Sequence, residues 1–156
     1  MTVLLLIRHG ENDYVKTGKL AGRIPGVQLN PRGQDQARAL SDALRGTPIQ
    51  AVYASPLERA LETAQPLAAD HQLQIIPEPD LMDTDVGTWQ GRSWKVLRLT
   101  KAWKIVQNAP SRFRFPAGES FPETQTRVVN VLERIIRKYS QPQALVAVVF
   151  HADPIK

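Results

Sequence analysis

The feature of this chain that most constrains its fold is the apolar run at residues 3–7 together with the tripeptide that follows it, Arg8, His9 and Gly10. Five consecutive Val, Leu and Ile residues predict a buried strand, typical of the centre of a parallel sheet. Ligands of such sheets bind outside the carboxyl ends of the strands. We therefore expect His9 to lie at a ligand-binding edge, with a guanidinium beside it and a glycine that lets the backbone approach closely.

The same tripeptide is suited to phosphoryl transfer. An imidazole nitrogen can take a phosphoryl group and pass it to water, and an adjacent arginine neutralises charge on the transferred oxygens. The alternative is a buried strand end with an incidental histidine, because the tripeptide alone occurs by chance in roughly one chain of this length in a hundred. His9 is therefore a nucleophile candidate that needs support from the rest of the chain.

Length and composition narrow the class of protein. With 156 residues, 42% of them hydrophobic, the chain is expected to form one domain, 1–156. It has no cysteine, which excludes disulfides and thiolate zinc sites, and three histidines leave little for a metal cluster. The apolar start is too short for a signal peptide, and no segment approaches the ~18 apolar residues of a membrane span. We expect a cytoplasmic protein with no metal, cofactor or membrane partner.

The formal net charge of +5 is concentrated in one segment that contains no acidic residue. Its seven cations are Arg92, Lys95, Arg98, Lys101, Lys104, Arg112 and Arg114. Such a segment attracts anionic partners, although a solvated surface is the alternative. Nucleic acid is not expected as a partner, because Trp94 and Trp103 are predicted in the core rather than as stacking platforms. We favour a basic helix over 93–107 that acts as a lid and an electrostatic funnel for an acidic substrate.

Apolar runs bounded by turn formers predict four strands, at 3–7, 51–54, 74–76 and 144–150. The segments between these strands have the residue spacing that is typical of helices. This alternation predicts an α/β fold, namely a three-layer α/β/α sandwich with a mainly parallel sheet.

Three helix starts carry capping signals. Asn30 and Ser55 each precede a proline, which is favoured at the first helical position, so both are predicted N-caps. Ser120 and Glu123 have the spacing of a capping box.

Polar residues follow three of the predicted strands: Arg8 and His9 the first, Ser55 and Arg59 the second, and His151 the last. Parallel strands would bring these residues to one edge of the sheet. The chain here resembles the histidine phosphatase superfamily, whose members share a phosphoglycerate-mutase-like fold. The resemblance rests on five blocks in the family's order: LIRHGE at 6–11, LNPRGQ at 29–34 with the nearby Gln36 and Ala37, ASPLERA at 54–60 with Thr63 and Ala64, LMDTDVGTWQG at 81–91, and HADPI at 151–155.

The resemblance implies a role for each matching residue. His9 would accept the phosphoryl group, and its oxygens would be held by Arg8, Arg59 and His151. Asp83 would protonate the leaving alcohol. Two further candidates for substrate binding are Asn12, which could equally cap a loop, and Arg23.

Each assignment has an ordinary structural alternative. Arg59 could be a surface residue paired with Glu58 or Glu62, and Asp83 and Asp85 could be turn formers. The pair of aspartates also resembles a magnesium-dependent haloacid-dehalogenase-like phosphatase, but residues 77–80 make a poor strand before it.

The chemistry also demands opposite protonation states. His9 must be neutral to attack, which neighbouring cations favour. Asp83 must hold a proton near neutral pH, which requires a pKa far above its reference value of about 3.9.

The chain also departs from the family pattern. It ends a few residues beyond His151, whereas family members usually carry a further helix and strand there, so we expect exposed apolar sheet surface. The longer insertion of the glycolytic mutases is absent. We therefore predict a metal-independent phosphohydrolase that cleaves a small phosphorylated metabolite through a phosphohistidine. The alternatives are a cofactor-dependent phosphoglycerate-mutase-like transferase and a catalytically silent phosphoester-binding protein.

Overall fold

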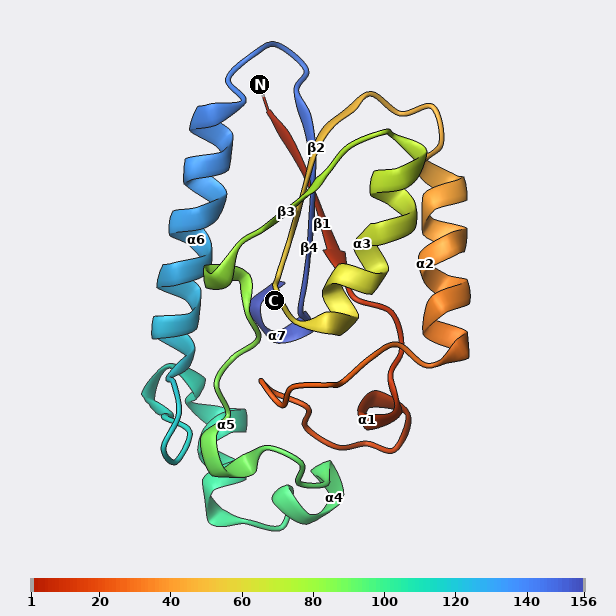
Figure 1. Ribbon diagram of the computed structural model, residues 1–156. Coiled ribbons are helices and arrows are strands. Elements are labelled where there is room, and N and C mark those ends of the chain that lie inside the picture. Colours follow the sequence, from red (N-terminus) through yellow and green to blue (C-terminus); the bar gives the residue numbers. More distant parts are fainter. Residues whose placement is uncertain (1, 156) are drawn as a thin grey trace.

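The computed structural model describes residues 2–155 and contains a four-stranded sheet in which every neighbouring pair of strands is parallel (Figure 1). The order along the sheet is β1-β4-β2-β3. The strands are β1 (Val3–Arg8), β2 (Ile49–Ala54), β3 (Ile75–Pro77) and β4 (Leu145–Phe150). The predicted α/β class and parallel sheet are confirmed.

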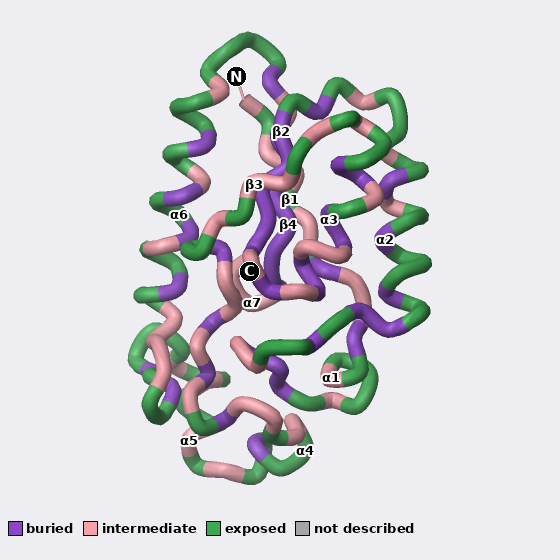
Figure 2. The backbone as a smooth tube through the Cα atoms, viewed as in Figure 1, coloured by how far each residue is buried: buried purple, intermediate pink, exposed green. Residues whose placement is uncertain are grey.

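Helices cover both faces of this sheet, which makes the three layers of a sandwich (Figure 1). One face carries α2 (Pro31–Leu44) and α3 (Glu58–Asp70), and the other carries α6 (Phe121–Lys138). Successive side chains of β2 and β4 point to opposite faces of the sheet, so they pack alternately against the two helical layers. Val52 and Val149 pack toward α3, whereas Tyr53 and Val148 pack toward α6. Figure 2 shows the central strands as the most continuously buried part of the chain.

The carboxyl ends of the strands face a region of loops and short helices, most of which lie in the lower half of Figure 1. Its elements are α1 (Asp13–Lys16), the single 3-10 turns η1 (Pro79–Leu81), η2 (Gly87–Trp89) and η3 (Pro110–Arg112), α4 (Trp94–Leu97), α5 (Lys101–Asn108) and α7 (Ala152–Ile155). An aromatic cluster around Trp89 packs η2, α4, α5 and the segment after η3 together, with Trp103, Phe113 and Phe115 in ring contact with Trp89. Among residues 2–155, no helix has both the length and the apolarity needed to traverse a lipid bilayer.

Two of the predicted helix caps are confirmed. The side chain of Asn30 accepts a hydrogen bond from the Gly33 amide at the start of α2, and Ser120 and Glu123 form the capping box of α6. The third cap is wrong. Helix α3 begins at Glu58 rather than at Pro56, and the Ser55 hydroxyl lies 2.8 Å from the His151 imidazole.

The prediction of β1 as a central strand is also wrong for the described residues. β1 pairs only with β4, and the side chains of Val3 and Leu6 are 43% and 42% exposed. A continuous apolar run cannot distinguish an edge strand from a central one. It indicates that both faces of the strand are covered, but not whether a neighbouring strand pairs with each of its edges.

The basic helix predicted over 93–107 is two helices. Thr100 caps α5 through its side chain and ends the preceding turn, and Leu99 beside it is 88% exposed. Trp94 and Trp103 pack into the aromatic cluster, as predicted. Six of the seven cations of this segment make no ion pair within residues 2–155, and Arg114 pairs with Glu123. Its role as a lid and funnel stays a prediction.

Candidate active site

A pocket of about 140 Å³ lies at the carboxyl ends of β1, β2 and β4. His9 and His151 directly follow β1 and β4, and the register pairs Arg8 with Phe150, so the two histidines leave the sheet side by side. Their rings are 5.2 Å apart between centroids. The charged and polar side chains that line the pocket belong to Arg8, His9, Asn12, Lys19, Arg59, Asp83 and Asp153.

His9 is buried and oriented by the loop that follows it. Its Nδ1 lies 2.7 Å from the Gly10 carbonyl oxygen, which can only accept, so Nδ1 carries the proton and Nε2 carries the free lone pair. Burial, together with the charges of Arg59 and Arg8, lowers the pKa of His9 to about 4 against the opposing effect of the Gly10 hydrogen bond. The ring is therefore neutral near pH 7, with Nε2 facing Arg59.

The loop after β1 fits tightly against the start of α2. A Cβ atom at Gly10 would lie 2.6 Å from the Gly33 carbonyl oxygen, so only glycine fits. The Gly10 amide donates to the Thr63 hydroxyl of α3, which in turn donates to the Arg59 carbonyl. These contacts tie the position of His9 to the helix that carries Arg59.

Arg59 lies at the centre of the pocket and is fully buried. Its Nη2 donates to the Gly22 carbonyl at 2.7 Å and to Asp83 Oδ2 at 3.1 Å, and its Nε lies 3.3 Å from His9 Nε2. The surface alternative for Arg59 is therefore wrong. Glu58 and Glu62 are engaged elsewhere, accepting from the amides of Gly26 and Leu29.

His151 completes the group from the end of β4. Its Nδ1 lies 3.2 Å from Arg59 Nη2, which can only donate, so the proton of the neutral ring resides on Nε2 and is directed at Ser55 Oγ. Burial and the charge of Arg59 lower the pKa of His151 well below its usual value. Ser55 thus orients a histidine instead of capping a helix, a role that its sequence context did not indicate.

Asp83 enters the pocket from the loop between η1 and η2. Oδ1 accepts from the Thr84 amide at 3.0 Å, and Oδ2 lies 3.1 Å from Arg59 Nη2 and 3.7 Å from His151 Nδ1. Burial raises the pKa of Asp83 to about 6, which the attraction of Arg59 opposes and the carboxylate of Asp153 assists. A carboxyl group with this pKa can hold a proton in mildly acidic solution.

Two hydrogen-bond donors in the pocket have no protein partner. Among residues 2–155, three buried side-chain polar atoms are unpaired, and two of them, Arg59 Nη1 and Asn12 Nδ2, belong to residues that line the pocket. Asn12 also caps α1, because its Oδ1 accepts from the Val15 amide. A buried donor without a partner costs about 1–3 kcal/mol, so these two groups point to an acceptor that arrives with a ligand.

The remaining candidates differ in position. Arg8 is exposed and lines the pocket mouth. Arg23 is not among the pocket-lining residues. Its guanidinium donates to the Asp83 carbonyl and pairs with Glu119, 3.0 Å away, so this placement favours support of the loop over contact with substrate. Asp85 does not line the pocket either, and it accepts from the Gly87 amide, in agreement with its turn-forming alternative.

The arrangement therefore joins a neutral imidazole, a buried guanidinium and a carboxyl group with a raised pKa in one small pocket. The sequence pattern of the histidine phosphatase superfamily, branch 1, matches residues 4–156. The chain belongs to this superfamily. Its fold agrees, since the chain is similar to the solved structure of Bacillus stearothermophilus YhfR with a TM-score of 0.91 and 26% identity, covering 100% of this chain and 77% of that one.

Two curated relatives extend the comparison of this histidine phosphatase superfamily member. The uncharacterized protein Rv0525 of Mycobacterium tuberculosis is 48% identical over 140 residues, covering 85% of this chain and 65% of the relative. The metal-independent phosphoserine phosphatase of Arabidopsis thaliana is 32% identical over 152 residues, covering 94% of this chain and 63% of the relative. The chain thus spans just under two thirds of the length of each.

Proposed function

We propose that this chain is a metal-independent phosphohydrolase that cleaves a small phosphate monoester through a phosphohistidine on His9. The observation that carries the proposal is the unpaired Nη1 of the buried Arg59 beside the unprotonated Nε2 of His9, whose lone pair accepts only from Arg59 Nε at 3.3 Å among residues 2–155. A tetrahedral dianion would satisfy that donor and the unpaired amide of Asn12, and would bring its phosphorus next to Nε2. The name of the Arabidopsis relative, a metal-independent phosphoserine phosphatase, supports the same reaction class.

In the first step, the lone pair of His9 Nε2 attacks phosphorus and the bond from phosphorus to the alcohol oxygen breaks. The leaving oxygen takes the proton of Asp83, because an alkoxide is too basic to depart alone. Arg59, Arg8 and Asn12 stabilise the negative charge on the transferred oxygens.

In the second step, a water molecule attacks phosphorus and the bond from phosphorus to His9 Nε2 breaks. The imidazole leaves as a neutral group, so this step does not depend on a base, and the proton that water releases returns to the Asp83 carboxylate afterwards. Inorganic phosphate leaves, and both His9 and Asp83 regain their starting protonation states. The oxygen atom and the proton that enter with water balance those that left with the alcohol.

The proposal predicts hydrolysis of p-nitrophenyl phosphate at an unchanged rate in excess chelator. Loss of activity to the chelator would contradict the metal-independent mechanism. Conversion between phosphoglycerates that depends on bisphosphoglycerate would favour the mutase alternative, and phosphate binding without any turnover would favour the silent binding protein. A panel of phosphorylated metabolites, with O-phosphoserine among them, would then identify the substrate.

The unpaired donors predict a site for inorganic phosphate or vanadate that stabilises the folded chain. At one hundred times the dissociation constant, a ligand adds about 2.7 kcal/mol to the free energy of unfolding, which raises Tm by roughly 5–10 °C for a chain of this length. Asn12→Asp should abolish most of this increase, because it keeps the Oδ1 cap of α1 but turns the unpaired amide into a repelling carboxylate. Arg45→Met is the control, since Arg45 is exposed and pairs with Asp42 outside the pocket. Equal stabilisation of all three proteins would contradict the predicted site.

A further inference from the structure

The loop that carries Asp83 has little regular structure of its own. Asp83 lies between two single 3-10 turns, η1 and η2, and no strand or longer helix fixes its backbone. An acid catalyst must nevertheless be held within a fraction of an ångström, since a misplacement of about 1 Å can lower the rate about 10²-fold. The position of Asp83 therefore has to be set by contacts from outside the loop.

Arg127 of α6 supplies most of these contacts. Its Nη1 donates to the carbonyl oxygens of Asp80 at 2.6 Å and Met82 at 2.7 Å, and its Nη2 donates to that of Asp83 at 3.0 Å. Arg23 Nε donates to the same Asp83 carbonyl at 2.9 Å. One guanidinium thus spans the whole segment that leads into the acid.

Glu119 fixes the guanidinium in turn. Its two carboxylate oxygens accept from Arg127 Nε at 2.9 Å and Nη2 at 3.0 Å, the bidentate geometry that restrains both partners. The same carboxylate accepts from the Asp85 amide at 2.9 Å, just beyond the acid. Partial burial would raise the pKa of Glu119, but these contacts and the charge of Arg23 together lower it to about 2, so the carboxylate is ionised near neutral pH.

Arg127 and Glu119 together form a clamp on residues 80–85, and helix α6 anchors this clamp to the core. Arg127 is followed in α6 by Val128 and Val131, which are buried against the sheet. Neither Arg127 nor Glu119 lines the pocket, so neither can touch a bound substrate from its present place. Their hydrogen bonds reach Asp83 through the backbone of residues 80–85, and the charge of Arg127 also helps to lower the pKa of His151.

We propose that Arg127 and Glu119 are positioning residues that hold Asp83 where its proton can reach the leaving oxygen. The inference rests on the proposed function, because it assigns a purpose to Asp83 that only phosphoester cleavage requires. It differs from ordinary structural support in one respect: loss of the clamp should harm only those reactions whose leaving group needs a proton.

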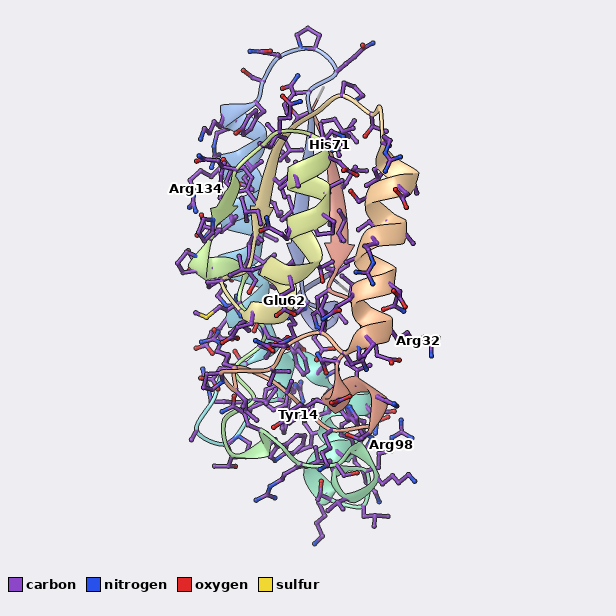
Figure 3. All side chains as sticks on the ribbon, turned by 45° about the vertical axis from the view of Figure 1, so that its right-hand side comes forward. Tyr14, Arg32, Glu62, His71, Arg98 and Arg134 are labelled. Carbon is purple, nitrogen blue, oxygen red and sulfur yellow. The ribbon has the colours of Figure 1, made fainter. Side chains whose placement is uncertain are left out.

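The test compares two substrates in two variants and one matched control. Arg127→Met and Glu119→Gln should each lower kcat for O-phosphoserine about 10- to 100-fold. The kcat for p-nitrophenyl phosphate should change less than about threefold, because its phenolate leaves without a proton. Arg134→Met is the control, since Arg134 also joins α6 to the start of this loop through Glu78, 2.6 Å away, but lies on the outer side of the helix and does not contact Asp83 (Figure 3).

The ratio of the two kcat values does not depend on how much of a variant is folded. A changed ratio in Arg127→Met and Glu119→Gln with an unchanged ratio in Arg134→Met supports the inference. Equal losses on both substrates in the two clamp variants overturn it and leave only a structural role. Asp83→Asn is assayed in parallel: if it changes the ratio and the clamp variants do not, the positioning role alone fails. If the unmodified protein hydrolyses neither substrate, the proposed function fails as well.

Discussion

Replacing His9 with alanine is expected to abolish hydrolysis of p-nitrophenyl phosphate and O-phosphoserine alike, lowering kcat by at least about 10⁴-fold. The reason is that His9 Nε2 is the nucleophile that attacks the substrate in the proposed reaction, and a good leaving group cannot replace a missing nucleophile. Steady-state kinetics on both substrates check this result.

Two controls separate loss of chemistry from loss of structure. His71→Ala should keep full activity, because His71 lies far from the pocket and contacts the carbonyl oxygens of Leu67 and Thr47. In Figure 3 it lies at the other end of the molecule from Tyr14, whose chain neighbour Val15 lines the pocket. The His9→Ala protein should still be stabilised by inorganic phosphate, since Arg59 and Asn12 remain. A His9→Ala protein that binds phosphate and retains more than about a hundredth of the activity would contradict the nucleophile assignment.

Replacing Asp83 with asparagine is expected to lower the rates of hydrolysis of the two substrates by very different factors. Hydrolysis of O-phosphoserine should fall about 10²- to 10⁴-fold, the usual contribution of a general acid. Hydrolysis of p-nitrophenyl phosphate should fall much less, because its leaving phenolate is a weak base. Asp85→Asn is the matched control from the same loop, since the Asp85 side chain caps the Gly87 amide and does not line the pocket. Equal losses on both substrates in Asp83→Asn would assign Asp83 to phosphate positioning or loop structure.

The pH dependence of kcat follows from the same two groups. The acid function of Asp83 is present below its raised pKa of about 6 and is lost as the pH rises through that value. The nucleophile function of His9 is lost only as the pH falls through about 4. For O-phosphoserine, kcat should therefore decline above pH 6, and this decline should be absent in Asp83→Asn and for p-nitrophenyl phosphate. A decline of equal size for both substrates would contradict the assignment of the acid.

Much of the fold followed from short-range patterns. The caps at Asn30 and Ser120 use local hydrogen bonds, so their residue types and spacing were sufficient. The errors at Ser55 and in the placement of β1 fell where long-range contacts decide the structure. Ser55 has the local pattern of a cap, but β4 brings His151 within reach of its hydroxyl. The break at Thr100 was missed because the surrounding apolar and basic residues fit one continuous helix equally well.

The same distinction applies to the site residues: some could be predicted from the sequence, and others depend on long-range contacts. Residues at the ends of parallel strands were expected to meet, and the structure brings His9 and His151 together with Arg59. The resemblance to a family was needed to single out Asp83. Nothing in the sequence indicated the clamp of Arg127 and Glu119, because its carbonyl acceptors are backbone groups that no side-chain pattern reveals. An arginine in the first turns of an amphipathic helix and a glutamate before its cap are ordinary surface features in a sequence.

The most direct test of the account is to trap the phosphoenzyme. The protein is mixed rapidly with excess p-nitrophenyl phosphate, quenched in alkali, where phosphohistidine survives, and digested for mass spectrometry. We predict one added phosphoryl group on the peptide that contains His9, lost on brief acid treatment and absent from His9→Ala. Hydrolysis that proceeds in full with no phosphoryl group on His9 under these conditions, or with one on another residue, would contradict the central claim.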